Sequence, residues 1–356
     1  MSDGMETGKK AVRPVFKNIV IVLGAAAVLI AAAAFLFAGG VFLSKPDKIL
    51  AAAYKSCKEN GLTEVFTDKK AEYTADLELS VGETDLSLKL SSAEKKKELT
   101  CSVGSHGIST EGTALLDENN LRVQIPIFGD TVFVYDYRQE NGGYIAELLE
   151  ENGISQTQCN QALADAMSDG DVTWDREEGG RLLLNTFRSL SFETTEKKTV
   201  RVNGKDRSCV GYRATVTPED MQIILNGIEK MQGDGYRIWM DRMLQVLGSD
   251  YESFLREWMS QETIYATFYI DGNRLAEVSV DNEAHTIMNL YFAGNEMLSV
   301  TVNAFSLEDK TCTGSIKLIR GADIRKMSGD QVDIGNATKE ELLKAAYTSL
   351  FRINGR

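Results

Sequence analysis

One stretch of the chain carries side chains whose types and spacing could hold an apolar molecule. Residues 236–260 follow a helical pattern, in which Tyr251, Phe254 and Trp258 recur at the three- and four-residue spacing of one helix face. Aromatic and thioether side chains offer large apolar contact surfaces. The candidates for lining a ligand groove are Trp239, Met243, Tyr251, Phe254 and Trp258. The same pattern is also typical of a helix face that packs on a sheet as core.

Residues that could perform catalysis or hold a metal ion are few. The chain has two histidines, His106 in a Gly-Ser turn and His285 at the start of an expected strand. No GxSxG, GxxxxGK[ST], GxGxxG, HExxH or EF-hand pattern occurs in the sequence. We therefore expect no catalytic, cofactor-binding or metal-binding residues and no bound cofactor. A hydrolase that uses two carboxylates and no histidine remains the alternative.

Five cysteines are spread along the chain without any CxxC pair, which argues against zinc-ribbon and thioredoxin-like sites. They are Cys57, Cys101, Cys159, Cys209 and Cys312. Cys101 and Cys209 lie in apolar strand patterns, where a cysteine usually behaves as a small buried hydrophobic residue. We expect free thiols, with one or two disulfides as the alternative.

The balance of charge argues against nucleic acid as a partner. The chain of 356 residues has a net charge of −13, and the segment 1–17 is the basic part. The remainder is strongly acidic and would repel a phosphate backbone. Its acidity mainly favours solubility.

Residues 18–43 form an apolar run of 26 residues without an ionisable group. About 20 apolar residues are enough for a helix to cross a bilayer. Lys9, Lys10, Arg13 and Lys17 precede the run, which by the positive-inside rule predicts a cytoplasmic N-terminus. We therefore expect a cytoplasmic tail at 1–17, a single transmembrane helix at 18–43 and an extracellular C-terminal part anchored in the cell membrane.

Beyond residue 44 the pattern alternates between helices and antiparallel strands. A helix is expected at 46–61, strands from Tyr73 to Tyr135 with polar turns between them, and helices over 144–170. The tempting basic cluster Lys95–Lys97 is better explained as a charged hairpin tip. One-sided alternation in these strands means that one face of the sheet is buried and the other is wet.

The second half repeats this organisation. Strands are expected around 182–217, with an Asn-Gly hairpin at 203–204, and a helix begins at Thr217-Pro218. Five strands follow over 264–318, and a capping box at Thr338 opens a last helix. The fold class predicted is α+β: an N-terminal transmembrane helix, then curved antiparallel β-meanders capped by amphipathic helices. Its parts are 44–180 and 181–356, as two domains or one continuous domain.

A stretch in the first half resembles proteins of a known organisation. LRVQIPIFGDTVFVYDY, followed by ELLEENGIS, resembles a segment of uncharacterised membrane-anchored envelope proteins of Gram-positive Firmicutes. Strand meanders with capping helices are also similar to the half-barrel of lipoprotein-carrier proteins (LolA-like and LppX-like). The resemblance implies a curved antiparallel sheet and brings no catalytic motif.

These observations together predict a protein that is not an enzyme. We expect a membrane-tethered binding or structural protein of the cell envelope, which holds an apolar ligand, such as a lipid, or an envelope protein on a curved sheet. The alternative function is the carboxylate-dependent envelope hydrolase. The expected partners are the bilayer, through residues 18–43, and a lipid or envelope protein, but no nucleic acid.

Overall fold

The computed structural model describes residues 44–68, 70–151, 155–168, 176–227, 230, 263–283, 286–292, 296–307 and 310–354. These residues belong to two compact units, each of which is discontinuous in the sequence. Unit 1 combines residues up to Thr67 with 172–317, and unit 2 combines 68–171 with the residues from Leu318 onward. The sequence predicts parts at 44–180 and 181–356, as two domains or one continuous domain. The last segment of the chain instead returns to the unit that contains the first strands.

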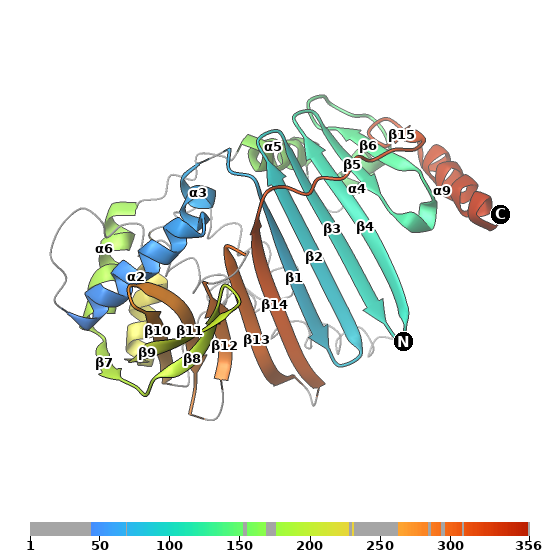
Figure 1. The fold of residues 1–356 in the computed structure, drawn as a ribbon. Coiled ribbons are helices and arrows are strands. Elements are labelled where there is room, and N and C mark those ends of the chain that lie inside the picture. The colour runs from blue at the N-terminus through green and yellow to red at the C-terminus, as the bar shows by residue number, and fades with distance from the viewer. Residues whose placement is uncertain are drawn as a thin grey trace. The chain divides into compact units, whose positions relative to one another are not determined.

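Unit 1 is a sheet covered by helices on one face (Figure 1). Its strand order is β14-β13-β12-β11-β10-β9-β7, and β8 pairs only with β9. The elements are α2 (Lys45–Glu59), α3 (Leu62–Thr67), α6 (Arg176–Ser189), β7 (Ser191–Thr194), β8 (Lys198–Val202), β9 (Lys205–Val216), β10 (Ile264–Asp271), β11 (Arg274–Asp281), β12 (Thr286–Tyr291), β13 (Leu298–Leu307) and β14 (Lys310–Arg320).

The core of unit 1 forms where α2 packs on β10 and β11. Ser44 caps the start of α2, and Pro46 occupies its first turn, where a missing backbone N–H costs nothing. Ile49, Leu50 and Cys57 of this helix are buried, as are Leu275 and Leu290 of the sheet. The apolar stripe of the helix therefore closes one face of the sheet.

Unit 2 is a sheet with the strand order β15-β6-β5-β4-β3-β2-β1. Neighbours from β1 to β6 are antiparallel, whereas β15 runs parallel to β6. The elements are β1 (Tyr73–Val81), β2 (Thr84–Ala93), β3 (Lys96–Ser105), β4 (Ile108–Asp117), β5 (Asn120–Gln124), the 3-10 turn η1 (Pro126–Phe128), β6 (Val132–Asp136), α4 (Tyr144–Glu151), α5 (Gln156–Ser168), β15 (Gln331–Asp333) and α9 (Lys339–Asn354).

A segment without regular secondary structure, 321–330, crosses the sheet of unit 2 before it enters β15 (Figure 1). We call this segment the strap. The backbone N–H of Gly321 donates to the carbonyl of Glu72, and the hydroxyl of Thr74 donates to the carbonyl of Gly321 at 2.9 Å. At its far end, Val132 N–H donates to the carbonyl of Asp330 at 2.9 Å. The strap thus links β1 to β6 across the strands between them.

The prediction for the N-terminal region is corrected. Residues 18–43, the expected transmembrane helix, lie outside the described residues. Among the helices that the structure describes, none is long and apolar enough to cross a membrane.

The predicted fold class also needs correction in its sheets. The structure is mostly β-sheet with few helices, and the parallel pairing of β15 with β6 makes the sheet of unit 2 mixed rather than purely antiparallel. Residues 182–189, expected as strand, belong to helix α6. Two glycines at 179–180 lower its intrinsic helix propensity, which hid the helix from the pattern. Its Leu183 and Thr186 are buried, so tertiary packing decides its conformation.

Several local predictions are confirmed. Asn203 and Gly204 both have positive φ in the β8–β9 hairpin, as a primed two-residue turn requires. The amide of Glu341 donates to the Thr338 hydroxyl while the Thr338 amide donates to the Glu341 carboxylate, which completes the capping box before α9.

The strap depends on a glycine, and this gives a stability prediction. Gly329 has φ +152°, and a Cβ built there would lie 1.6 Å from the backbone oxygen of Asp130. We expect Gly329→Ala to destabilise the chain by about 2 kcal/mol or more, because backbone must move to accommodate the methyl group. The urea midpoint, followed by circular dichroism, measures the loss.

The matched control for this experiment is Gly142→Ala. A Cβ at Gly142 meets nothing within 4 Å. Its free energy of unfolding should stay within about 0.5 kcal/mol of the wild-type value. Equal midpoints for the two variants would show that the strap does not need glycine at position 329.

Candidate binding surface

The register of unit 2 gathers apolar side chains on one face of its sheet. Directly paired residues of antiparallel strands point to the same side. Three successive rows across β1, β2, β3 and β4 therefore share one face, and none of them contains a charged residue. The rows are Ala75-Leu90-Leu99-Ala114, Leu77-Leu88-Cys101-Gly112 and Leu79-Leu86-Val103-Thr110. We call this surface the leucine face.

Much of the leucine face is open. Leu99 has 44% of its surface exposed, Val103 40% and Leu90 36%. The apolar surface continues to the tip of the β3–β4 hairpin, where Ile108 is 78% exposed. Single exposed apolar residues are ordinary, but neighbours on adjacent strands form a contiguous patch.

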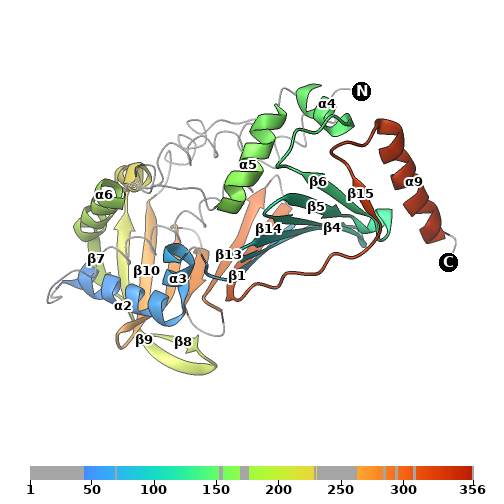
Figure 2. The same ribbon diagram turned by 90° about the horizontal axis from the view of Figure 1, so that it is seen from above.

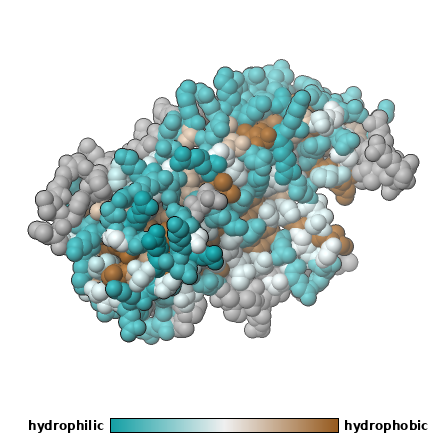
Figure 3. Space-filling view, viewed as in Figure 1, coloured by the Kyte–Doolittle hydropathy of each residue, from teal (hydrophilic) through white to brown (hydrophobic). Residues whose placement is uncertain are grey.

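The opposite face of the same strands is mostly polar, and it is buried at one end, whereas Glu78, Asp85, Ser87 and Ser109 further along it are exposed. Glu98, the residue next to Leu99, is 1% exposed, and Ser91 and Thr74 are also buried. Sequence alternation predicts that the apolar face is buried and the polar face is wet. In β3 the order is reversed at Glu98 and Leu99, because the polar residue is the buried one. Figure 3 views the molecule from the same side as Figure 1 and shows a mostly hydrophilic surface with hydrophobic patches between.

The strap explains why the polar face can be buried. Glu98 accepts a hydrogen bond of 2.7 Å from the backbone N–H of Arg325, and the Arg325 guanidinium lies 3.8 Å from the same carboxylate. The guanidinium also donates to Glu111 at 3.1 Å, and Lys89 forms an ion pair with Asp323. A buried carboxylate is tolerated when it is paired and hydrogen-bonded in this way.

Helices cover the leucine side of the sheet at one end. Leu116 and Tyr135 lie on the same side as the three rows, one row further along the strands. They form a cluster with Tyr137 and Met167, against which Ile145 of α4 and Leu163 of α5 pack. Figure 2 shows α5 and the strap on opposite sides of this sheet. This side of the sheet is therefore covered at one end and open at the other, and the row at the covered end also carries Ser92 and Lys97 on β2 and β3.

The groove residues expected from the sequence cannot be placed on either sheet. Trp239, Met243, Tyr251, Phe254 and Trp258 lie outside the residues that the structure describes. The leucine face was not among the candidate residues, although its signal was present in the period-two leucines of 77–90. Alternation identifies residues that share a face but not which face the rest of the chain covers.

The hydrolase alternative requires two carboxylates that face each other in a cavity. Two glutamates of the described chain are almost fully buried, and each has a cationic partner: Glu98 has Arg325, and Glu277 lies 2.7 Å from Lys198 Nζ. Burial alone would lower the pKa of Lys198, but the hydrogen bond and charge of Glu277 outweigh it and raise that pKa. An amine held protonated beside its carboxylate stabilises the sheet and is not poised for proton transfer at neutral pH.

Metal-binding clusters of three or more His, Cys, Asp or Glu residues do not occur among the described residues. His106 occupies the β3–β4 turn with φ +52° and lies 2.6 Å from Glu83. Both side chains are about three-quarters exposed. His285 lies outside the described residues. The described histidine thus joins two hairpin tips at the surface.

The thiols are free where the structure describes them. Cys57, Cys101, Cys159 and Cys209 form no disulfide, which confirms the expectation for these four, and the side chain of Cys312 is outside the described part. Cys101 lies in the middle row of the leucine face and is partly exposed. Burial raises the pKa of the Cys57 thiol to about 12 and also raises that of Cys209, where the charges of Asp271 and Glu277 add to the effect.

Comparisons with known proteins identify no relative. No model of a known protein family matches the chain, and no curated protein is significantly similar to it. The argument about function therefore rests on the chemistry of the surfaces described above.

Native cysteines report directly on which surfaces are open. With N-ethylmaleimide at neutral pH, we expect Cys101 to react well before Cys57 and Cys209, because it is accessible and they are buried with raised pKa values. Peptide mapping by mass spectrometry after short reaction times measures the order. In urea all three thiols should react at similar rates. Protection of Cys101 comparable to that of Cys57 in the folded chain would mean that the leucine face is covered.

Proposed function

We propose that this protein is a binding protein without catalytic activity of its own, which holds an apolar ligand on the leucine face. The observation that carries the proposal is the inverted burial of β3: Glu98 is 1% exposed while its neighbour Leu99 is 44% exposed. Since Leu90, Leu99 and Val103 stay open while Glu98 is covered, the sheet retains an apolar surface that a ligand can cover.

The exposed apolar surface of the leucine face supplies the free energy for binding an apolar ligand. Burying apolar surface stabilises by about 25 cal/mol per Å². Leu90, Leu99 and Val103 each leave more than a third of their surface uncovered. Contact with an apolar molecule would remove this surface from water. Monomeric proteins rarely leave such patches without a binding role.

The form of the surface favours a small apolar molecule over a flat protein partner. The three rows contain no charge, and Thr110 and Cys101 are their only side chains with a polar or thiol group, so they offer little to a partner that needs hydrogen bonds. One end of the same side is roofed by α4 and α5, which pack on Leu116 and Tyr135. A ligand on the rows would have apolar protein beneath it and at one end, as in most small-molecule sites. An acyl chain has suitable chemistry.

A neutral fluorescent probe tests the proposal. N-phenyl-1-naphthylamine becomes bright in apolar sites, and we expect the full chain to bind it. Leu90→Thr combined with Leu99→Thr should raise its Kd by about tenfold or more, since two leucine side chains are lost from the contact. Threonine is β-branched and suits a strand, so the sheet should persist. Fluorescence titration gives the Kd.

The matched control is Ile223→Thr, which removes an exposed apolar side chain from the helix that begins at Pro218. It should leave the affinity unchanged. Equal affinities for wild type and the double leucine variant, with both chains folded by circular dichroism, would contradict the proposal. Capture of a second protein that is lost in the double variant, without any probe binding, would instead assign the face to a protein partner.

A further inference from the structure

A cleft in unit 1 has a chemistry different from that of the leucine face. It lies between α2 and the strands β9 and β10, with a cavity volume of about 980 Å³. Ala51, Ala52 and Ile270 supply apolar lining, and Tyr212 contributes an aromatic ring. Ala51 is partly exposed on this lining, whereas Ala52 is buried against the sheet. The volume lies within the range of small-molecule sites, which is about 300–1,000 Å³.

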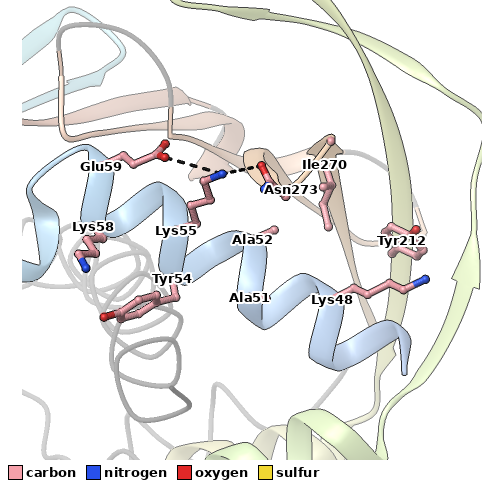
Figure 4. Close-up of a pocket in the computed structure, with 11 residues that line it drawn as sticks. Lys48, Ala51, Ala52, Tyr54, Lys55, Lys58, Glu59, Tyr212, Ile270 and Asn273 are labelled. Atoms are coloured by element: carbon pink, nitrogen blue, oxygen red, sulfur yellow. Dashed lines mark hydrogen bonds and ion pairs between the residues drawn. The ribbon is translucent and has the colours of Figure 1, made fainter. Parts of the chain in front are cut away.

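One stripe of α2 borders this cleft with charges. Lys48, Ala52, Lys55 and Glu59 follow one another at four-, three- and four-residue spacing, so they lie on the same helix face. Figure 4 shows Lys48 extending toward Tyr212 and Lys55 toward Asn273, while Tyr54 and Lys58 point away from them. Two ammonium groups therefore stand on the strand side of the cleft.

The positive charge of the cleft is only partly compensated. Lys55 Nζ donates to Asn273 Oδ1 at 2.8 Å and lies 3.9 Å from Glu59. Glu59 is shared, because Arg274 Nε lies 2.8 Å from its other oxygen. Glu59 is the one carboxylate among the residues that line the cleft, and Lys48 has no ion pair within the described chain. A cationic site persists here in a protein whose net charge is −13.

We propose that this cleft binds an organic anion, namely a molecule with an apolar or planar body and a carboxylate, phosphate or sulfonate group. The body would contact Ala51 and Tyr212, which are partly exposed, and the anionic group would meet the ammonium groups of Lys48 and Lys55. Lysine provides a compact charge that suits such oxyanions. Asn273 holds Lys55 in place, so less side-chain freedom is lost when the anion binds.

Two dyes that share a ring system separate charge from apolar contact. 8-Anilinonaphthalene-1-sulfonate carries the anion, and N-phenyl-1-naphthylamine lacks it. The sulfonate also binds open apolar surfaces, so all titrations use the full chain with Leu90→Thr and Leu99→Thr, at low ionic strength. Because the cleft does not involve these leucines, the result does not depend on whether the leucine face binds ligands.

In this background, Lys48→Gln should raise the Kd of the sulfonate by about threefold, and Lys48→Gln with Lys55→Gln by about tenfold. The Kd of the neutral dye should not change. Added salt should weaken sulfonate binding to the unsubstituted cleft more than binding to the double lysine variant. Salt screens the lysine charges of the unsubstituted cleft, and the double variant no longer has them.

Lys55→Gln removes the hydrogen bond to Asn273 and could perturb α2. Lys48→Glu is a second variant that leaves this hydrogen bond in place. Lys48 has no side-chain partner among the described residues, so reversing its charge should leave the fold intact. The affinity for the sulfonate should fall further than in Lys48→Gln. Lys205→Glu, at the exposed β8–β9 turn, is the matched control with the same change of net charge. Equal loss in both glutamate variants, or unchanged sulfonate affinity in the double lysine variant, would overturn the proposal.

Discussion

The carboxylate of Glu98 is the constraint on which the arrangement of unit 2 depends. It is almost fully buried in the middle of the sheet, and such a group must be paired and hydrogen-bonded or it costs several kcal/mol. The strap meets this need with the backbone N–H and the guanidinium of Arg325. Because the strap comes from the end of the chain, unit 2 is complete only when residues beyond 320 have returned to strands formed near residue 70.

Because the strap covers the polar residues around Glu98, the leucines on the other face of the same strands remain exposed. Once the strap lies over Glu98, Ser91 and Thr74, the leucines of the same strands face the other way, and helices roof that side only at the end near Tyr135. The proposed ligand surface is thus a consequence of how the buried charge is satisfied. In unit 1 the apolar face of the sheet is the covered one, because α2 packs on it. A cleft bordered by lysines remains beside this helix.

The sequence predicts local structure better than it predicts what covers each face. Alternation correctly located β1, β2, β3 and the strands between 264 and 318, because a period of two is a backbone property. It did not single out β4, where Gly112, Thr110 and Thr113 weaken the apolar pattern, and it gave no sign of the strap, which has neither period nor motif. The sequence shows that the leucines share one face of the sheet. It does not show that this face is open, because the covering of the other face depends on contacts between residues more than 200 positions apart. Hydropathy also suggested a membrane helix that the described structure does not support.

The inverted burial of β3 can be tested at two neighbouring positions. Leu99→Cys and Thr100→Cys place a thiol on opposite faces of one strand, and labelling with a maleimide followed by peptide mapping compares their accessibility. The account predicts fast labelling at position 99, slow labelling at position 100, and protection of position 99 alone when a neutral apolar ligand is added. Fast labelling at 100 with protection at 99 in the free protein would show that the leucines form the covered face, and the proposed ligand surface would not exist.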